Sequence, residues 1–276
     1  MLKKKSNKKG TWVLIAGLVI GLAIMLYPLA SQIYYDASLE STTDEFRQAV
    51  EEMSITEEKD ENVQLAEAYN EALDPNLNWV DPYSDEERSE GLSNYADMLK
   101  VQEQIGIVNI HKIKVELPIY AGTSEEVLQR GVGHLEGTSL PVGGENTHSV
   151  LTAHRGLPEA RLFTDLVEME IGDTFSVETI AGEFYYEVDQ ITVVEPTDID
   201  AVRIEEGQDY VTLLTCTPYM INSHRLLVRG HRIDAPDETE LETQSSWWSN
   251  IGPYWQYILL ILVVILLLWI FIRQTT

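Results

Sequence analysis

The sequence predicts a mainly β domain, a barrel or sandwich of seven to eight short strands, preceded by a helical segment and flanked by two membrane-spanning helices. Three observations carry this prediction. Short β-branched and apolar runs alternate with turn signals from Ile105 to about residue 235. An acidic segment with helical periodicity comes before them, from residue 36 to about 73. Two long apolar stretches lie near the two ends of the chain.

The first apolar stretch, from Thr11 to about Tyr35, follows a cluster of five lysines. It is long enough to cross a bilayer core of about 30 Å, and the lysines would keep the N-terminus in the cytoplasm. A cleaved signal peptide is the alternative, although Leu29-Ala30-Ser31 offers only a poor cleavage site and the apolar run is long for a signal. We therefore assign residues 1–35 to a basic cytoplasmic tail and an anchor helix.

Residues 36–100 are expected to form a helical segment and a loop. Two apolar faces recur at helical spacing, which predicts a pair of amphipathic helices packed on the domain beyond; the faces are Phe46, Val50 and Met53, and Leu65, Tyr69 and Leu73. Asp74-Pro75 and Asp81-Pro82-Tyr83 then break the pattern, because proline removes a donor and restricts the preceding residue. On these grounds alone, the second is a loop that bears an aromatic side chain.

Residues 101–235 are expected to form the β domain. The predicted strands are 106–113, 115–120, 149–152, 174–180, 184–193, 210–215 and 226–233. An acidic linker follows at 236–252, and a second membrane-spanning helix at 253–273 is preceded by tryptophan and tyrosine side chains of the kind found at membrane interfaces. This arrangement predicts a two-pass protein with both termini in the cytoplasm and the domain outside.

The charge of the chain is strongly negative and unevenly distributed. It has 19 basic and 45 acidic residues, a net charge of −26, which argues against nucleic acid as a partner. Six of the basic residues lie at the two ends, so 13 remain between them against all 45 acids, a net of −32. Membrane lipid is an expected partner of the apolar ends, whereas the acidic middle is expected to be well solvated.

Cys216 is the only cysteine in the chain, and it lies where a strand is expected to end. Tyr210 to Thr215 reads as a buried strand that should stop near Cys216, because Pro218 cannot donate to a ladder, and the next strand resumes at Leu226 with Arg225 at its start. Cys216 and Arg225 would therefore lie at neighbouring strand ends on one edge of the sheet. A lone thiol is either an inert core residue or a nucleophile, and this position favours a nucleophile.

A nucleophilic thiol needs a partner that accepts its proton or stabilises the thiolate. Of the six histidines, five have surroundings that favour a structural role: His111 and His134 in strand- or turn-like segments, His148 in a polar turn, His224 beside Arg225 and His231 in the last strand. His154 instead follows the apolar run 149–153 and opens into a loop, as Cys216 does. It is the leading candidate, although these patterns alone do not exclude the others.

Several motifs resemble those of sortases. Thr212-Leu213-Leu214-Thr215-Cys216 resembles the Thr-Leu-X-Thr-Cys signature of that family, with an arginine at the expected distance. The longer run to Arg232, together with residues 153–166, is similar to class C, the pilus-building sortases, and Asp81-Pro82-Tyr83 resembles the lid motif of this class. The resemblance covers about residues 60–235 and the flanking apolar segments. Ala121 and Met220 depart from the family pattern at positions without catalytic chemistry.

The resemblance implies a closed sortase-type β-barrel and a cysteine transpeptidase, a thiol peptidase of the hydrolase class, at the outer membrane face of a Gram-positive bacterium. It implies that Cys216 is the nucleophile, His154 the general acid and base, and Arg225 the cation that orients substrate and stabilises the oxyanion. The implied substrates are pilins or surface proteins with an LPXTG-like sorting signal, and the implied acceptor is a pilin lysine.

The resemblance also implies that the loop at Asp81, Pro82 and Tyr83 is a regulatory lid. In that arrangement Tyr83 covers Cys216 and Asp81 pairs with Arg225.

Two other functions remain open. One is a sortase that attaches surface proteins to the cell-wall precursor, although the lid motif and the C-terminal apolar segment favour pilus assembly. The other is a non-catalytic, membrane-held binding module with an inert thiol. No cofactor or metal is expected, because the sequence lacks the ligand spacing of a zinc site, the acidic pattern of an EF-hand and a glycine-rich phosphate loop.

Overall fold

The structure is a computed structural model of the chain. It describes residues 8–53, 57–73, 93–196 and 200–236, together with Tyr83, Asp198, Leu259 and Leu262.

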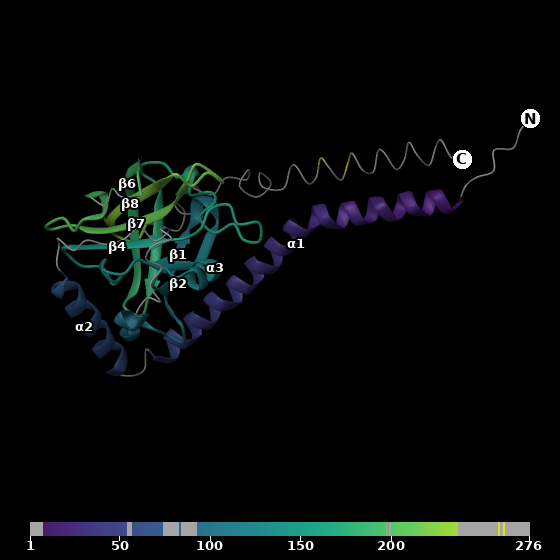
Figure 1. The fold of residues 1–276 in the computed structure, drawn as a ribbon. Coiled ribbons are helices and arrows are strands. Elements are labelled where there is room, and N and C mark those ends of the chain that lie inside the picture. Colours follow the sequence, from purple (N-terminus) through teal and green to yellow (C-terminus); the bar gives the residue numbers. More distant parts are fainter. Residues whose placement is uncertain are drawn as a thin grey trace, which may run out of the picture.

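Eight strands form a closed barrel in the order β1-β2-β3-β4-β7-β8-β6-β5 (Figure 1). They are β1 (Gln104–Ile110), β2 (Val115–Ala121), β3 (Val132–His134), β4 (Thr147–Thr152), β5 (Thr174–Thr179), β6 (Gly182–Val194), β7 (Asp209–Thr217) and β8 (His224–Ile233). The predicted mainly β fold with seven to eight strands is confirmed. The sequence patterns missed only β3, which is three residues long and contains a glycine, too short for period-2 alternation to be visible.

Strand direction determines which ends of the strands meet. β4 and β7 are parallel, with Thr152 opposite Leu214, so both end at the same edge of the barrel. β8 is antiparallel to β7 and therefore begins at that edge. Consequently, residues that follow β4, end β7 and begin β8 are brought together although they are far apart in the sequence.

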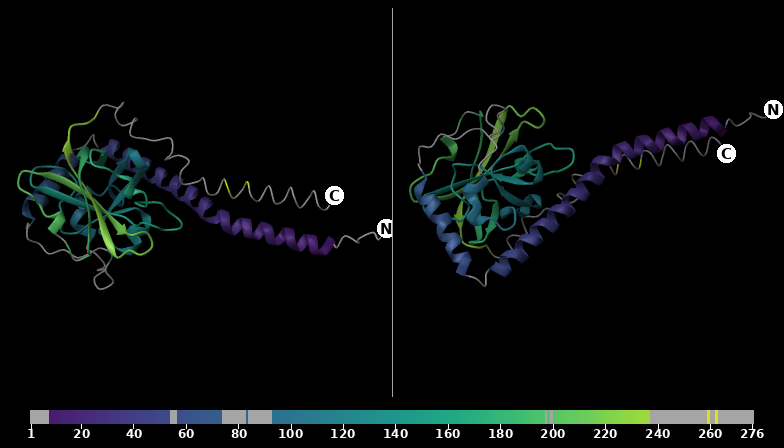
Figure 2. Two further views of the ribbon diagram at one scale, coloured as in Figure 1. Left: turned by 90° about the horizontal axis from the view of Figure 1, so that it is seen from above. Right: turned by 60° about the horizontal axis from the view of Figure 1, so that its bottom comes forward.

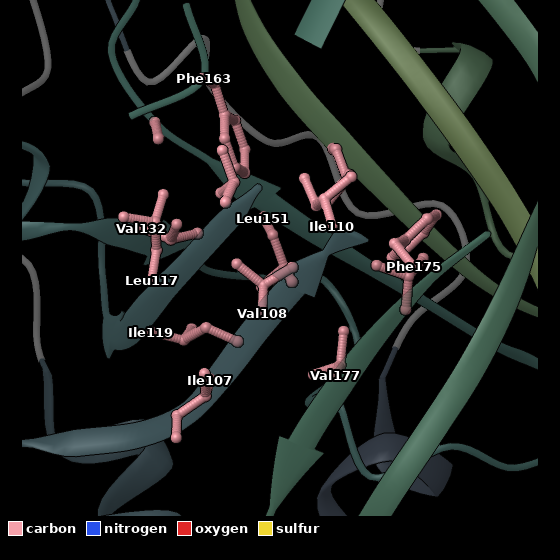
Figure 3. Close-up of a cluster of buried hydrophobic side chains, with 14 of the residues drawn as sticks. Ile107, Val108, Ile110, Leu117, Ile119, Val132, Leu151, Phe163, Phe175 and Val177 are labelled. Atoms are coloured by element: carbon pink, nitrogen blue, oxygen red, sulfur yellow. The ribbon is translucent and has the colours of Figure 1, made fainter. Parts of the chain in front are cut away.

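The core fills the barrel with β-branched and aromatic side chains. Figure 3 shows part of this cluster, contributed by β1, β2, β3, β4 and β5, with Phe163 from the loop after β4. Successive residues of β1, such as Ile107 and Val108, are both buried. Because β1 is covered on both faces, its sequence does not show the apolar–polar alternation of a strand with one face in solvent.

Two long helices precede the barrel, α1 (Lys8–Met53) and α2 (Glu57–Ala72). The second half of α1 lies along β1 and β2, and its first half projects away from the barrel (Figures 1 and 2). Phe46 is buried against the barrel, and Arg47 contacts Glu116 and Glu178 at 2.9 Å each. The predicted packing of the first helix on the domain, through the face that contains Phe46, is therefore confirmed.

One predicted face of α2 is wrong in part. Leu65 is 49% exposed, whereas its neighbour Ala66 is fully buried. Asn70 is also buried, and its side-chain amide bonds both backbone polar groups of Leu140, at 2.7 and 3.0 Å. The helix is thus rotated so that small and polar side chains meet the barrel. Asn70 there pairs the buried N–H of Leu140 and donates to its carbonyl oxygen, which also accepts from the Val142 N–H.

Within the part of the chain that the structure describes, no helix is both long and apolar enough to cross a membrane. The two flanking membrane helices expected from the sequence are therefore not supported. The first apolar stretch does not form a separate helix but the N-terminal half of α1, which continues through Pro28. The second, at 253–273, lies outside the described residues apart from Leu259 and Leu262.

Five short helices complete the described fold. They are α3 (Glu125–Arg130) and the 3-10 turns η1 (Ser93–Leu99), η2 (His111–Ile113), η3 (Leu166–Glu168) and η4 (Asp200–Val202). α3 begins with a side-chain cap from Ser124 to the backbone N–H of Val127. It packs on β3 at Gly133, where an added Cβ would meet the Leu128 side chain at 3.0 Å and the Gly122 carbonyl oxygen at 2.5 Å. Glycine at this position allows α3 to lie directly against the barrel.

Candidate active site

The end of β7 and the start of β8 form the centre of the candidate site. Cys216 is directly opposite Arg225 in the β7–β8 ladder, and β7 ends one residue later at Thr217. The predicted placement of these residues at neighbouring strand ends is confirmed. Cys216 is 5% exposed and Arg225 is 6% exposed, so both lie at the barrel rim but are covered.

His154 leaves the end of β4 beside these residues. The Thr215 hydroxyl donates to the Ala153 carbonyl oxygen at 2.8 Å, and the Ala153 N–H donates to the Leu214 carbonyl oxygen at 3.2 Å. These bonds hold the segment that carries His154 against the strand that carries Cys216. As the sequence predicts, His154 lies just beyond a strand end, at the same edge as Cys216.

The loop after His154 is held by its own polar contacts. The Phe163 N–H donates to the His154 carbonyl oxygen at 3.1 Å, which closes the loop onto its start. The Arg155 guanidinium donates to the Thr164 carbonyl oxygen at 3.2 Å and to the Thr217 hydroxyl at 3.1 Å. Arg155 thereby ties the His154 loop to the end of β7.

Arg225 is oriented by its surroundings in the β7–β8 connection. Its Nη1 donates to the carbonyl oxygens of Asn222 and His224 at 2.9 and 3.1 Å. Its guanidinium carbon also lies 5.0 Å from the centre of the Tyr83 ring, a cation–π distance. The buried charge is therefore surrounded by acceptors and an aromatic face.

Tyr83 lies between His154 and Arg225. Its ring centre is 5.6 Å from that of His154. Its hydroxyl donates to the Ala153 carbonyl oxygen at 2.7 Å and lies 2.8 Å from the Thr152 hydroxyl, which then acts as the donor because a phenol has a single proton. Asp81 and Pro82, the other residues of the predicted lid, lie outside the described residues.

The apolar surface beneath Tyr83 is a second, smaller hydrophobic cluster. It is formed by buried side chains of β4, β7 and β8 and their neighbours, with Tyr83 packed against them; its buried members are Leu135, Val150, Val202, Leu214 and Leu227. Tyr83 therefore packs on an apolar surface and also makes polar contacts at the end of β4.

Two of the other histidines are structural. Burial lowers the pKa of His134 and of His148 to about 4, and each ring is hydrogen-bonded inside the protein. His134 contacts the Tyr95 hydroxyl at 2.7 Å, and His148 contacts the Thr212 hydroxyl at 2.7 Å. The structural role expected for both is confirmed, although His148 lies within β4 and not in the polar turn that the sequence suggested.

Glu125 lies at the site, although no sequence pattern pointed to it. Its carboxylate oxygen Oε1 lies 3.5 Å from Nε2 of His154. Glu125 is one of two adjacent glutamates at the start of α3, and no pattern in the sequence distinguishes the two. Among the described residues, no group of three or more His, Cys, Asp or Glu side chains is arranged to hold a metal ion.

Comparisons with known proteins agree with this geometry. Residues 108–233, which span most of the barrel, match the sortase domain family. Sortase C-1 of Streptococcus pneumoniae is 52% identical, with a TM-score of 0.67, and the match covers 71% of this chain and 100% of that structure. Sortase C2 of Pilus Island 1 of group B Streptococcus is 58% identical, with a TM-score of 0.61, covering 65% of this chain and 99% of that one.

More distant relatives match over about half of the chain. Sortase D of Bacillus subtilis (strain 168) is 32% identical over 131 residues, which are 46% of this chain and 63% of that protein. Sortase A of Bacillus anthracis is 27% identical over 132 residues, 48% of this chain and 61% of that protein. The chain thus matches less than two thirds of the length of these curated relatives. Taken with the near-complete match to solved structures at more than 50% identity, these results show that the chain belongs to the sortase family, with class C sortases as its structural neighbours.

Proposed function

We propose that this chain is a cysteine transpeptidase that cleaves an LPXTG-like sorting signal and transfers the acyl group to a pilin lysine, which builds a covalent pilus. The observation that carries the proposal is that strand pairing brings Cys216, Arg225 and the segment that carries His154 to one edge of the barrel. A thiol nucleophile, a proton-transferring group and a fixed cation are the groups that acyl transfer through a thioester requires.

In this mechanism the Cys216 thiolate attacks the carbonyl carbon of the signal's threonine. The bond from that carbon to the following amide nitrogen breaks, and protonated His154 donates its proton to the leaving amine. The product is a thioester on Cys216. The lysine amine of the acceptor pilin then attacks the thioester, His154 accepts a proton from that amine, and the thiolate leaves as the isopeptide bond forms.

Arg225 stabilises the negative charge on the substrate oxygen in both steps. The contacts of Nη1 with the Asn222 and His224 carbonyls hold the guanidinium at the rim of the barrel. A donor fixed before reaction stabilises developing charge more effectively than one that must reorient.

In the resting enzyme, the segment of Asp81, Pro82 and Tyr83 acts as a lid. The support is the position of the Tyr83 ring between His154 and Arg225, with its hydroxyl bound at the end of β4. A side chain in this position competes with substrate for the same groups. Pairing of Asp81 with Arg225 remains a prediction from the resemblance.

A membrane location is also part of the proposal. The N-terminal half of α1 projects from the barrel (Figure 1) and exposes apolar side chains, including Ile20 at 60% and Ile24 at 70%. Exposed apolar surface of this kind favours contact with lipid. With Cys216 replaced by alanine, single cysteines at Ser6 and Thr275 should resist an impermeant thiol reagent on intact cells, and labelling of either would exclude the two-pass arrangement.

Co-expression with candidate pilins tests the proposed reaction. The unmodified enzyme should yield a high-mass ladder of linked pilins on a denaturing gel, and Cys216→Ala should abolish the ladder while leaving the thermal unfolding temperature nearly unchanged. His154→Ala should be almost as damaging, because the leaving amine then has no proton donor. Ladder formation or a thioester in Cys216→Ala would refute the mechanism, since the chain has no other cysteine.

A further inference from the structure

Glu125, in helix α3, lies close to His154, the proposed general acid and base. Its Oε1 atom is 3.5 Å from His154 Nε2, and that nitrogen is buried from solvent. The histidine side chain is 16% exposed and the glutamate side chain 39% exposed, so the pair lies partly inside the protein. Coulomb interactions are stronger there than between fully solvated groups.

The carboxylate is held in place by its own helix. The side-chain amide of Gln129, one turn later in α3, donates to the same Oε1 atom at 3.0 Å. α3 is in turn fixed to the barrel by the buried Leu128 and by its packing on Gly133, and to α1 by a hydrogen bond from the Tyr35 hydroxyl to the Gln129 carbonyl oxygen.

The fold also explains why the contact reaches His154. Gly133, the point where α3 touches the barrel, pairs with Thr152 across β3 and β4, and His154 follows two residues later. The carboxylate and the imidazole are thus positioned by the same short stretch of sheet.

We propose that Glu125 is a positioning residue for His154, whose carboxylate holds the imidazole through Nε2, leaves Nδ1 to exchange the proton with the amines, and stabilises the protonated ring. The inference rests on the proposed function, since it assigns a partner to the proposed acid and base. An anion next to one ring nitrogen fixes the tautomer and the orientation of a histidine. The negative charge also offsets the repulsion between the protonated ring and the cations nearby.

Groups from several elements lie near this imidazole. Glu125 on α3 is 3.5 Å from it and the Tyr83 ring centre is 5.6 Å from its own. Cys216 at the end of β7 and Arg225 at the start of β8 stand at the same edge of the barrel, and Arg155 is the next residue of the His154 loop. Two of them are cations that disfavour a protonated ring. Removal of the Glu125 charge should therefore lower the pKa of His154, and the protonated form that the leaving amine requires should be lost at lower pH than in the parent enzyme.

The test compares Glu125→Gln with Glu126→Gln, which removes the same charge from the next, exposed residue of α3. All variants are made in the full chain with Tyr83→Ala, and the probe is a quenched fluorescent peptide that contains Leu-Pro-X-Thr-Gly. Glu125→Gln should reduce kcat about tenfold with little change in KM, and should move the alkaline limb of the kcat/KM profile to lower pH by about half a unit. Glu126→Gln should match the parent, and Glu125→Asp, which keeps the charge, should retain the parent pH profile.

A second measurement does not depend on turnover. Imidazole NMR titration, with the His154 signal identified by its loss in His154→Ala, should show a lower pKa in Glu125→Gln than in Glu126→Gln. Equal pKa values and equal pH profiles in the two variants would overturn the role of Glu125. If the parent cleaves the peptide no faster than Cys216→Ala, the proposed function fails instead, and the titration still decides whether Glu125 acts on His154.

Discussion

The lid proposal makes a quantitative prediction about access to Cys216. Tyr83→Phe removes one hydroxyl, which makes two hydrogen bonds at the end of β4, at 2.7 and 2.8 Å. Tyr83→Ala also removes the ring that packs on the small hydrophobic cluster and faces Arg225 at 5.0 Å. Cys216 is 5% exposed, so a reagent can reach the thiol only after the structure opens.

The magnitude follows from these contacts. Loss of the hydroxyl should cost the closed state about 1–2 kcal/mol, which raises the open population by about 5- to 30-fold. Loss of the whole ring removes a further cation–π contact of about 1 kcal/mol and some apolar burial, so the open state should approach full population. If opening is fast relative to alkylation, the alkylation rate follows the open population until that limit is reached.

The assay is the rate of iodoacetamide addition to Cys216, followed by intact-protein mass spectrometry. We expect the rate to rise about tenfold in Tyr83→Phe and more in Tyr83→Ala. Tyr185→Phe is the matched control, because it removes a tyrosine hydroxyl that bonds Glu183 on β6, away from the site. If both Tyr83 variants react at the rate of the parent and of the control, the barrel itself covers the thiol and the lid reasoning is refuted.

Three further predictions concern the site and the fold. Arg225→Lys should lower kcat/KM on the peptide by about a hundredfold, since lysine cannot reproduce the planar donor fork; near-normal turnover would show that a point charge suffices. Asn70→Ala should lower the free energy of unfolding by about 1–3 kcal/mol, measured in urea, because it leaves the buried N–H of Leu140 unpaired, while the Leu140 carbonyl oxygen keeps its bond from the Val142 N–H; exposed Glu71→Ala should change it little. Stability should fall as the pH drops from about 6.5 to about 4, because the unfolded chain then binds protons at His134 and His148 that the folded chain excludes. A lowering from 6.5 to about 4 is worth about 3 kcal/mol per histidine, so a flat stability profile over this range would contradict the burial of neutral rings.

Local signals in the sequence were enough to identify the strands and the reactive strand ends. β-branched runs between turn residues predicted all of the long strands, since each must present an apolar face to the core. Pro218 ended β7 just beyond Cys216, and the resumption of apolar residues after Arg225 placed the cation opposite the thiol. His154 was recognised in the same way, as a polar residue directly after an apolar run.

The mainly β fold and the residues that stand at strand ends can therefore be predicted from the chain alone, because both depend on patterns within a few residues. Which strand ends meet cannot be predicted in this way, since the parallel pairing of β4 with β7 joins segments about 60 residues apart. The three-residue strand β3, the face of α2 with Leu65 outward, and the contact of Glu125 with His154 likewise depend on closure of the barrel. From the sequence, a carboxylate at the start of a short helix cannot be distinguished from any solvated acid; the sheet beneath that helix brings it to a partly buried imidazole.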